Sequence, residues 1–190
     1  LPAELPIMYG RDDELRALRS LLAEHRLVTI VGAGGIGKSR LAQAVAHASV
    51  EHWPDGVWTV ELAGLSEPAL LPNAIAGALD FEIVGKDTAL EELVAGLVPR
   101  TTLLVLDNCE HLLDAVVRSV EVVLRAAPGV TLLATSQEPL RTPDEQQFRV
   151  GPLAVPQETE ARGAREFGAV ALLEARVRAV DPDFALNEEN

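Results

Sequence analysis

The sequence has little cysteine, few basic residues and no long hydrophobic run. Its one cysteine, Cys109, excludes an internal disulfide and suits a reducing compartment. No apolar stretch approaches the roughly 18 residues that a membrane-spanning helix needs. The 190 residues carry 16 Lys and Arg against 29 Asp and Glu, for a formal net charge of -13, which opposes binding to nucleic acid or an anionic membrane. We therefore expect a cytoplasmic protein that makes no membrane contact, and any DNA contact to lie in domains outside this chain.

Glycine is concentrated in one stretch, residues 27–46, which reads LVTIVGAGGIGKSRLAQAVA. An apolar strand, a glycine loop, Lys-Ser and a helical apolar pattern follow one another there, and residues 32–39 fit GxxxxGK[ST], the phosphate-binding loop (P-loop). Such a loop points backbone N–H groups and a helix N-terminus at phosphates. Lys38 is expected to reach the β- and γ-phosphates, and the Ser39 hydroxyl to bind Mg²⁺. The predicted nucleotide contacts of this segment are Gly32, Ala33, Gly34, Gly35, Ile36, Gly37, Lys38, Ser39 and Arg40.

The same glycines allow a second interpretation, because Gly32, Gly34 and Gly37 alone fit the GxGxxG fingerprint of dinucleotide-binding Rossmann folds. That fold has no use for Lys38-Ser39 and requires an acidic residue at the end of its second strand, about 20 residues on. Asp55 precedes the candidate strand and Glu61 lies further off. The P-loop interpretation is favoured, with Rossmann as the alternative.

Strands and helices alternate along the chain. Apolar runs predict strands at 27–31, 57–62, 102–106, 130–134 and, at an edge, 148–150. Helical spacing predicts helices around 12–22, 39–46, 68–79, 88–98, 112–127 and 165–180, with a capping box made by Thr88 and Glu91. This order predicts a single α/β domain over residues 1–190: a three-layer P-loop NTPase sandwich, with a mostly parallel sheet and helices on both faces.

Polar residues follow two of the predicted buried strands. Asp107 ends the strand at 102–106, where a carboxylate can hold the Mg²⁺ that bridges the β- and γ-phosphates, although an Asp here can also be a plain helix cap. Many P-loop ATPases place an acidic residue next, but here Asn108 follows. Glu110 is the nearest carboxylate and is either the base that activates water or a first-turn helix residue. Ser136, with Thr135, ends the next strand, where it could sense the γ-phosphate.

These motifs together resemble the STAND class of signal-transduction ATPases, and more narrowly the NB-ARC-like ATPase region of large actinobacterial transcriptional regulators, many with LuxR-type DNA-binding tails. The resemblance covers YGRDDEL (9–15), TIVGAGGIGKSRLA (29–42), LLVLDNCEHLL (103–113), LLATSQEPL (132–140), VGPLAVP (150–156) and AVALLEARVRAV (169–180).

The resemblance implies that Tyr9, Gly10 and Arg11 lie against adenine and ribose. It also implies a switch, closed with ADP and open with ATP, that is coupled to an output domain and to self-association of the full-length protein. Gln137 departs from the pattern, since the family commonly has an arginine there that reads the γ-phosphate. We also expect the chain to be a fragment that stops before the helical and winged-helix subdomains.

Two functions remain open on these residues. The first is a weak ATPase with Lys38, Asp107 and Glu110 as catalytic residues and Ser39 and Asp107 as metal ligands. The second is a scaffold that binds ATP or ADP without hydrolysing it, which Asn108 and Gln137 favour. Slow hydrolysis is the expectation, and no arginine-rich lid segment supports a kinase.

Overall fold

A computed structural model describes residues 8–85, 87–156, 167–182, 184 and 186. Its strands are β1 (Leu27–Val31), β2 (Val57–Glu61), β3 (Thr102–Asp107), β4 (Val130–Ser136) and β5 (Gln146–Arg149). Its α-helices are α1 (Asp12–Glu24), α2 (Lys38–Ala48), α3 (Leu71–Ala78), α4 (Ala89–Leu97), α5 (Leu113–Ala126) and α6 (Gly168–Arg178). Within the described residues they are connected by the 3₁₀ turns η1 (Val50–His52), η2 (Pro68–Leu70) and η3 (Cys109–His111).

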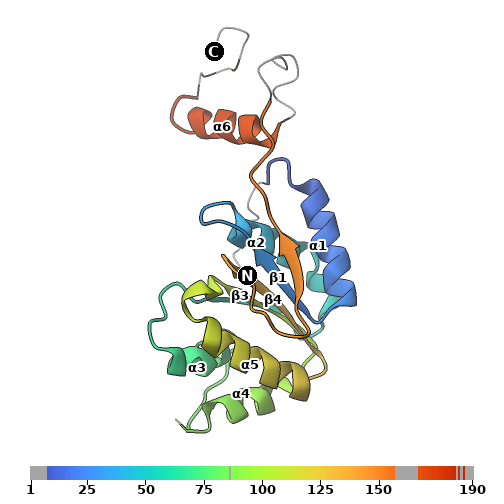
Figure 1. The fold of residues 1–190 in the computed structure, drawn as a ribbon, viewed down its shortest axis with the longest axis vertical. Coiled ribbons are helices and arrows are strands. Elements are labelled where there is room, and N and C mark those ends of the chain that lie inside the picture. Colours follow the sequence, from blue (N-terminus) through green and yellow to red (C-terminus); the bar gives the residue numbers. More distant parts are fainter. Residues whose placement is uncertain (1–7, 86, 157–166, 183, 185, 187–190) are drawn as a thin grey trace.

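The five strands form one sheet in the order β2-β3-β4-β1-β5, and every neighbouring pair is parallel (Figure 1). The predicted α/β P-loop architecture is confirmed. In a Rossmann sheet β1 lies between β2 and β4, whereas here it lies between β4 and β5, so the dinucleotide-binding alternative is wrong.

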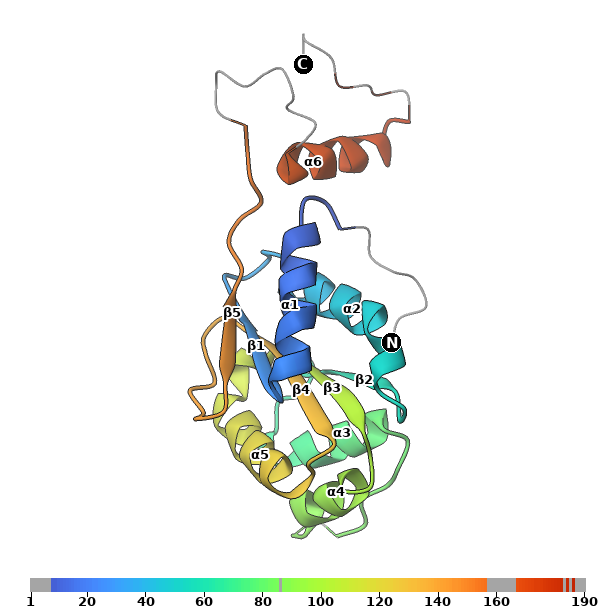
Figure 2. The ribbon, with the colours of Figure 1, turned by 90° about the vertical axis from the view of Figure 1, so that its right-hand side faces the viewer.

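Helices cover both faces of the sheet, with α1 and α2 on one face and α3, α4 and α5 on the other (Figure 2). Strand β3 illustrates why, because successive side chains of a strand point to opposite faces. Leu103 and Val105 belong to the core under α1 and α2, and Leu104 and Leu106 to the core under α3–α5. All six residues of β3 are buried, as the continuous apolar run predicts.

Two local predictions are wrong in detail. Residues 68–79 form η2 and then α3 instead of one helix, and Pro72, which lacks an N–H, stands in the first turn where a helix can begin again. The edge strand is Gln146–Arg149 and not 148–150. The predicted last helix is observed as α6, and residues 165–166 lie outside the described ones.

The capping box of Thr88 and Glu91 is also wrong, because the Thr88 side chain makes no cap hydrogen bond and binds Glu92 instead. The Thr88 hydroxyl donates to the Glu92 carboxylate at 2.7 Å, and the backbone N–H groups of Val84 and Gly85 donate to it at 2.9 and 3.0 Å. These hydrogen bonds, of which the one from Thr88 has the largest effect, lower the pKa of Glu92 below its usual range.

Among the described helices, none has the length and apolar character that a membrane crossing requires.

Candidate functional site

The loop between β1 and α2 has a backbone that only glycines can adopt easily. Gly35 and Gly37 have φ angles of +74° and +99°, in the left-handed region that side chains rarely enter. Gly32 has a different requirement, because a Cβ there would lie 2.8 Å from the backbone oxygen of Val150, just after β5. The Gly32 N–H donates to the Ser136 carbonyl at 3.3 Å. The start of the loop is thus fitted between the ends of β4 and β5.

Lys38, the first residue of α2, has its ammonium group inside this loop. The Nζ atom donates to the carbonyl oxygens of Gly32 and Ala33, both at 3.0 Å, and the residue is only 8% exposed. The loop therefore holds a positive charge at the helix N-terminus, where anions are stabilised.

Asp107, at the end of β3, is fixed by its neighbour in the sheet. The Thr135 hydroxyl on β4 donates to Asp107 Oδ1 and accepts from the Asn108 N–H at 2.9 Å. Asp107 is 8% exposed. This hydrogen bond orients the carboxylate at the carboxyl edge of the sheet, where ligands of open α/β sheets bind.

Glu110 reaches the same edge although it follows Asp107 by three residues. Asn108 has a left-handed φ of +67° and starts η3, so Glu110 lies in this 3₁₀ turn and not in the first turn of α5. Gln137 Nε2 donates to Glu110 Oε1 at 2.8 Å. Glu110 Oε2 is buried, and within the described residues it has no hydrogen-bond partner.

Lys38, Glu110 and Thr135 line a first cavity of about 330 Å³, which we call the P-loop pocket, and Asp107 lies behind Thr135 and is not part of the lining. It is lined by Gly34, Gly35, Gly37, Lys38, Ser39, Arg40, Asn108, Glu110, Thr135 and Gln137. Thr135 lines it, whereas the Ser136 hydroxyl is buried and accepts from the Glu138 N–H at 3.3 Å. At the end of β4, the residue that lines the pocket is therefore Thr135 and not the predicted Ser136.

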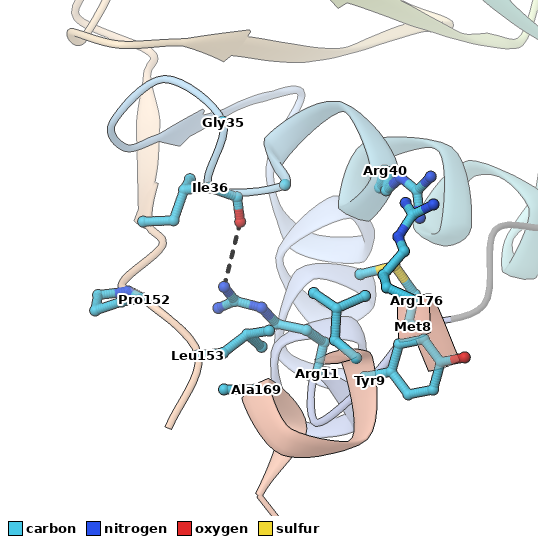
Figure 3. A pocket seen from close by; sticks show the side chains of 12 residues that line it. Met8, Tyr9, Arg11, Gly35, Ile36, Arg40, Pro152, Leu153, Ala169 and Arg176 are labelled. Atoms are coloured by element: carbon cyan, nitrogen blue, oxygen red, sulfur yellow. Dashed lines mark hydrogen bonds between the residues drawn. The ribbon is translucent and has the colours of Figure 1, made fainter. Parts of the chain in front are cut away.

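A second cavity of about 450 Å³, the side cavity, adjoins the loop (Figure 3). Its lining comes from four parts of the chain: Met8, Tyr9 and Arg11; Gly35, Ile36, Gly37 and Arg40; Pro152 and Leu153; and Ala169, Leu172 and Arg176. Gly35, Gly37 and Arg40 line both cavities. An elongated ligand could therefore occupy the two cavities together.

Arg11 links three of these parts. Its guanidinium donates to the Ile36 carbonyl at 3.4 Å, as drawn in Figure 3, to the Gly151 carbonyl at 2.8 Å, and to Glu14 at 2.8 Å. It is 5% exposed. Arg11 therefore braces the cavity wall in addition to lining it.

Gly10 joins α6 to the segment before α1. A Cβ on Gly10 would lie 2.8 Å from the Cα of Gly168, and a Cβ on Gly168 would lie 2.7 Å from the Tyr9 carbonyl. The backbones approach so closely that neither position has room for a side chain.

The structure brings the predicted residues of the loop, of strand ends β3 and β4, and of segment 9–11 to one region. Sequence reasoning assigned no role to Pro152, Leu153, Ala169, Leu172 or Arg176. The spacing of 169, 172 and 176 along one helix face was the available signal for the last three.

The residues present fit a hard cation. A serine hydroxyl and a carboxylate, Ser39 and Asp107, are oxygen ligands of the type that Mg²⁺ takes beside phosphate oxygens. The described residues contain no cluster of three or more His, Cys, Asp or Glu side chains that would hold a metal alone. Cys109 is inert, because burial, with the charges of Asp107 and Glu110, raises the pKa of its thiol.

The fit of Gly32 can be tested with a matched pair of substitutions. Gly32→Ala should lower the free energy of unfolding by about 1–3 kcal/mol, because the new Cβ meets the Val150 carbonyl. Gly34→Ala is the control, since its Cβ would have only Gln137 Nε2 at 3.8 Å. Urea denaturation of both variants measures the difference, and equal stability would contradict the close approach.

The chain is similar in sequence to several known proteins. The chain is 34% identical over 180 residues to an uncharacterized protein of Mycobacterium tuberculosis, covering 95% of this chain and 43% of that protein. It is 37% identical over 173 residues to a "Putative HTH-type transcriptional regulator" of the same species, covering 91% and 18%. It is 31% identical over 150 residues to the regulatory protein AfsR of Streptomyces griseus, covering 72% and 15%. The chain thus spans less than half the length of these relatives.

Solved structures share the fold at low identity. Cdc6p from Pyrobaculum aerophilum superposes with a TM-score of 0.59 at 18% identity, over 78% of this chain and 48% of that one. A Signal Transduction ATPase with Numerous Domains from Pyrococcus horikoshii, with a tetratricopeptide repeat sensor, superposes with a TM-score of 0.52 at 15% identity, over 97% of this chain and 27% of that one.

The family model of the AAA ATPase domain matches residues 8–137, which include the P-loop, Asp107 and Glu110. The chain belongs to the AAA ATPase domain family.

Proposed function

We propose that this chain is the nucleotide-binding module of a larger transcriptional regulator, which binds Mg-ATP and Mg-ADP, hydrolyses ATP slowly and acts as a nucleotide-dependent switch. The observation that carries the proposal is the P-loop pocket, in which the buried Lys38 ammonium, Ser39, Glu110 and Thr135 converge. DNA contact would then belong to domains outside this chain, and nucleotide-dependent self-association to the full-length regulator.

In this proposal the polyphosphate occupies the P-loop pocket. Phosphate oxygens replace the carbonyls of Gly32 and Ala33 as acceptors for Lys38, and the loop N–H groups donate to them. Ser39 and Asp107 would hold Mg²⁺, which neutralises charge on the phosphates when bound. The nucleoside extends into the side cavity, against Tyr9 and Ile36.

Glu110 is proposed as the base for hydrolysis. Its Oε1 is held by Gln137, and its buried Oε2 has an acceptor position to fill. Oε2 would take a proton from water as the water oxygen bonds to the γ-phosphorus and the bond to the bridging oxygen breaks, giving ADP and phosphate. Because Asn108 stands next to Asp107 and Gln137 carries no charge, we expect slow turnover.

The switch is proposed to act through α6. This helix contributes Ala169, Leu172 and Arg176 to the side cavity, and the contact between Gly10 and Gly168 ties its first turn to the segment beside Tyr9. A nucleotide in the side cavity would therefore contact α6 directly, so that a change of nucleotide can alter the position of whatever follows α6 in the regulator.

A non-hydrolysing holder of ATP or ADP remains the second candidate. The hydrogen bond from Gln137 to Glu110 favours it, because an amide that occupies one carboxylate oxygen can also restrain the carboxylate from reaching water.

Lys38→Ala tests nucleotide binding. Loss of the Lys38 ammonium from the P-loop pocket should weaken Mg-ATP and Mg-ADP binding at least roughly tenfold, since hydrogen bonds to charged groups are the strong ones. Isothermal titration calorimetry measures both affinities, with Arg118→Ala, an exposed position on α5, as the control. Binding retained by Lys38→Ala would refute the P-loop assignment.

Glu110→Gln separates the two candidate functions. If Glu110 is the base, single-turnover conversion of Mg-ATP with protein in excess should slow by about a hundredfold or more, with affinity unchanged. Glu61→Gln is the matched control, because Glu61 ends β2 beside Asp107 in the register and does not line the P-loop pocket. Unchanged turnover in Glu110→Gln removes Glu110 as base, and a wild type that leaves bound ATP intact supports the holder.

A further inference from the structure

The side cavity concentrates positive charge in an acidic chain. Among the described residues, those that line it include the arginines Arg11, Arg40 and Arg176 and no Asp or Glu. Over the whole sequence acidic residues outnumber basic ones by 29 to 16. A cavity with this lining therefore favours an anionic ligand.

The three arginines differ in how their charges are used. Arg11 is buried, and its guanidinium donates hydrogen bonds to Glu14 and to two backbone carbonyls. Arg40 and Arg176 are exposed, and neither has a hydrogen bond or ion pair with another described residue. By contrast Arg178, two residues further along α6, pairs with Glu174 at 2.8 Å.

Arg40 and Arg176 reach the cavity from different elements. Arg40 stands in the first turn of α2 and lines the P-loop pocket as well, so it lies where a nucleotide passes from its phosphates to its nucleoside. Arg176 comes from the last turn of α6, on the face that also presents Ala169 and Leu172. Figure 3 shows both side chains at the same end of the cavity.

We propose that Arg176 is a nucleotide-binding residue that, together with Arg40, binds a phosphate group of the nucleotide and so joins α6 to α2. Two like charges that face one cavity repel each other, and an anion between them replaces this repulsion with two attractions. Arginine suits the task because its planar guanidinium donates two parallel hydrogen bonds to phosphate oxygens.

This inference rests on the proposed nucleotide function and adds a phosphate contact from α6, beyond residues 8–137 of the matched family domain. It has a consequence for selectivity. Ligands with phosphates should depend on Arg176, whereas adenosine, which lacks them, should not.

The test is calorimetric titration of the chain with Mg-ATP, Mg-ADP and adenosine. Arg176→Ala should weaken both nucleotides roughly tenfold, the loss of one charge-assisted contact, and leave adenosine affinity unchanged. Arg176→Lys keeps the charge and should retain part of the affinity, and Arg176→Glu should lose more than Arg176→Ala. Arg178→Ala is the matched control and should stay within about twofold of wild type for every ligand.

The outcomes separate this inference from the function on which it rests. If wild type binds no nucleotide, the proposed function and the inference both fail. If Lys38→Ala abolishes binding but Arg176→Ala changes nothing, only the role of Arg176 is refuted. If Arg176→Ala weakens adenosine as much as Mg-ATP, the side chain acts on the nucleoside or on the position of α6, and the phosphate contact is likewise refuted.

Discussion

The site depends on one arrangement of backbone, the meeting of the carboxyl ends of β1, β3 and β4 at a single edge of a parallel sheet. Because β1 lies beside β4 and β4 beside β3, the loop after β1 shares a pocket with Thr135, whose hydroxyl donates to Asp107. The hydrogen bond between those two side chains would have no equivalent in a sheet of different order. Gly32 allows the loop to pack against this edge, because a Cβ there would meet the Val150 carbonyl.

A second constraint connects that edge to the chain beyond the sheet. Segment 150–153 leaves β5 past Arg11, whose guanidinium binds the Gly151 carbonyl, and α6 packs its first turn on Gly10. The wall of the side cavity is therefore assembled from four separated stretches that hold one another in place. A ligand in that cavity would contact α6 directly, which is what the proposed switch requires.

Much of the fold and part of the site could be predicted from the sequence. Strands such as 102–106 can be predicted because they are continuous apolar runs. The glycines with Lys38 and Ser39 form a motif that predicts phosphate binding. The position of Glu110 could not be predicted, because it depends on the left-handed turn at Asn108 that forms η3. Thr135 could not be separated from Ser136, since the face each one presents is decided by the sheet register. The role of α6 in the cavity depends on contacts distant in sequence, such as Gly10 with Gly168.

In the proposed function, one nucleotide lies between the P-loop, the segment before α1 and α6. Amide hydrogen exchange of the chain with and without Mg-ADP tests it most directly, because bound ligand slows the local opening of the backbone that it contacts. We expect slower exchange in residues 32–40, 9–11 and 168–176 together, at the same ligand concentration. Protection confined to other segments, or protection of 32–40 with 168–176 unaffected, would contradict it.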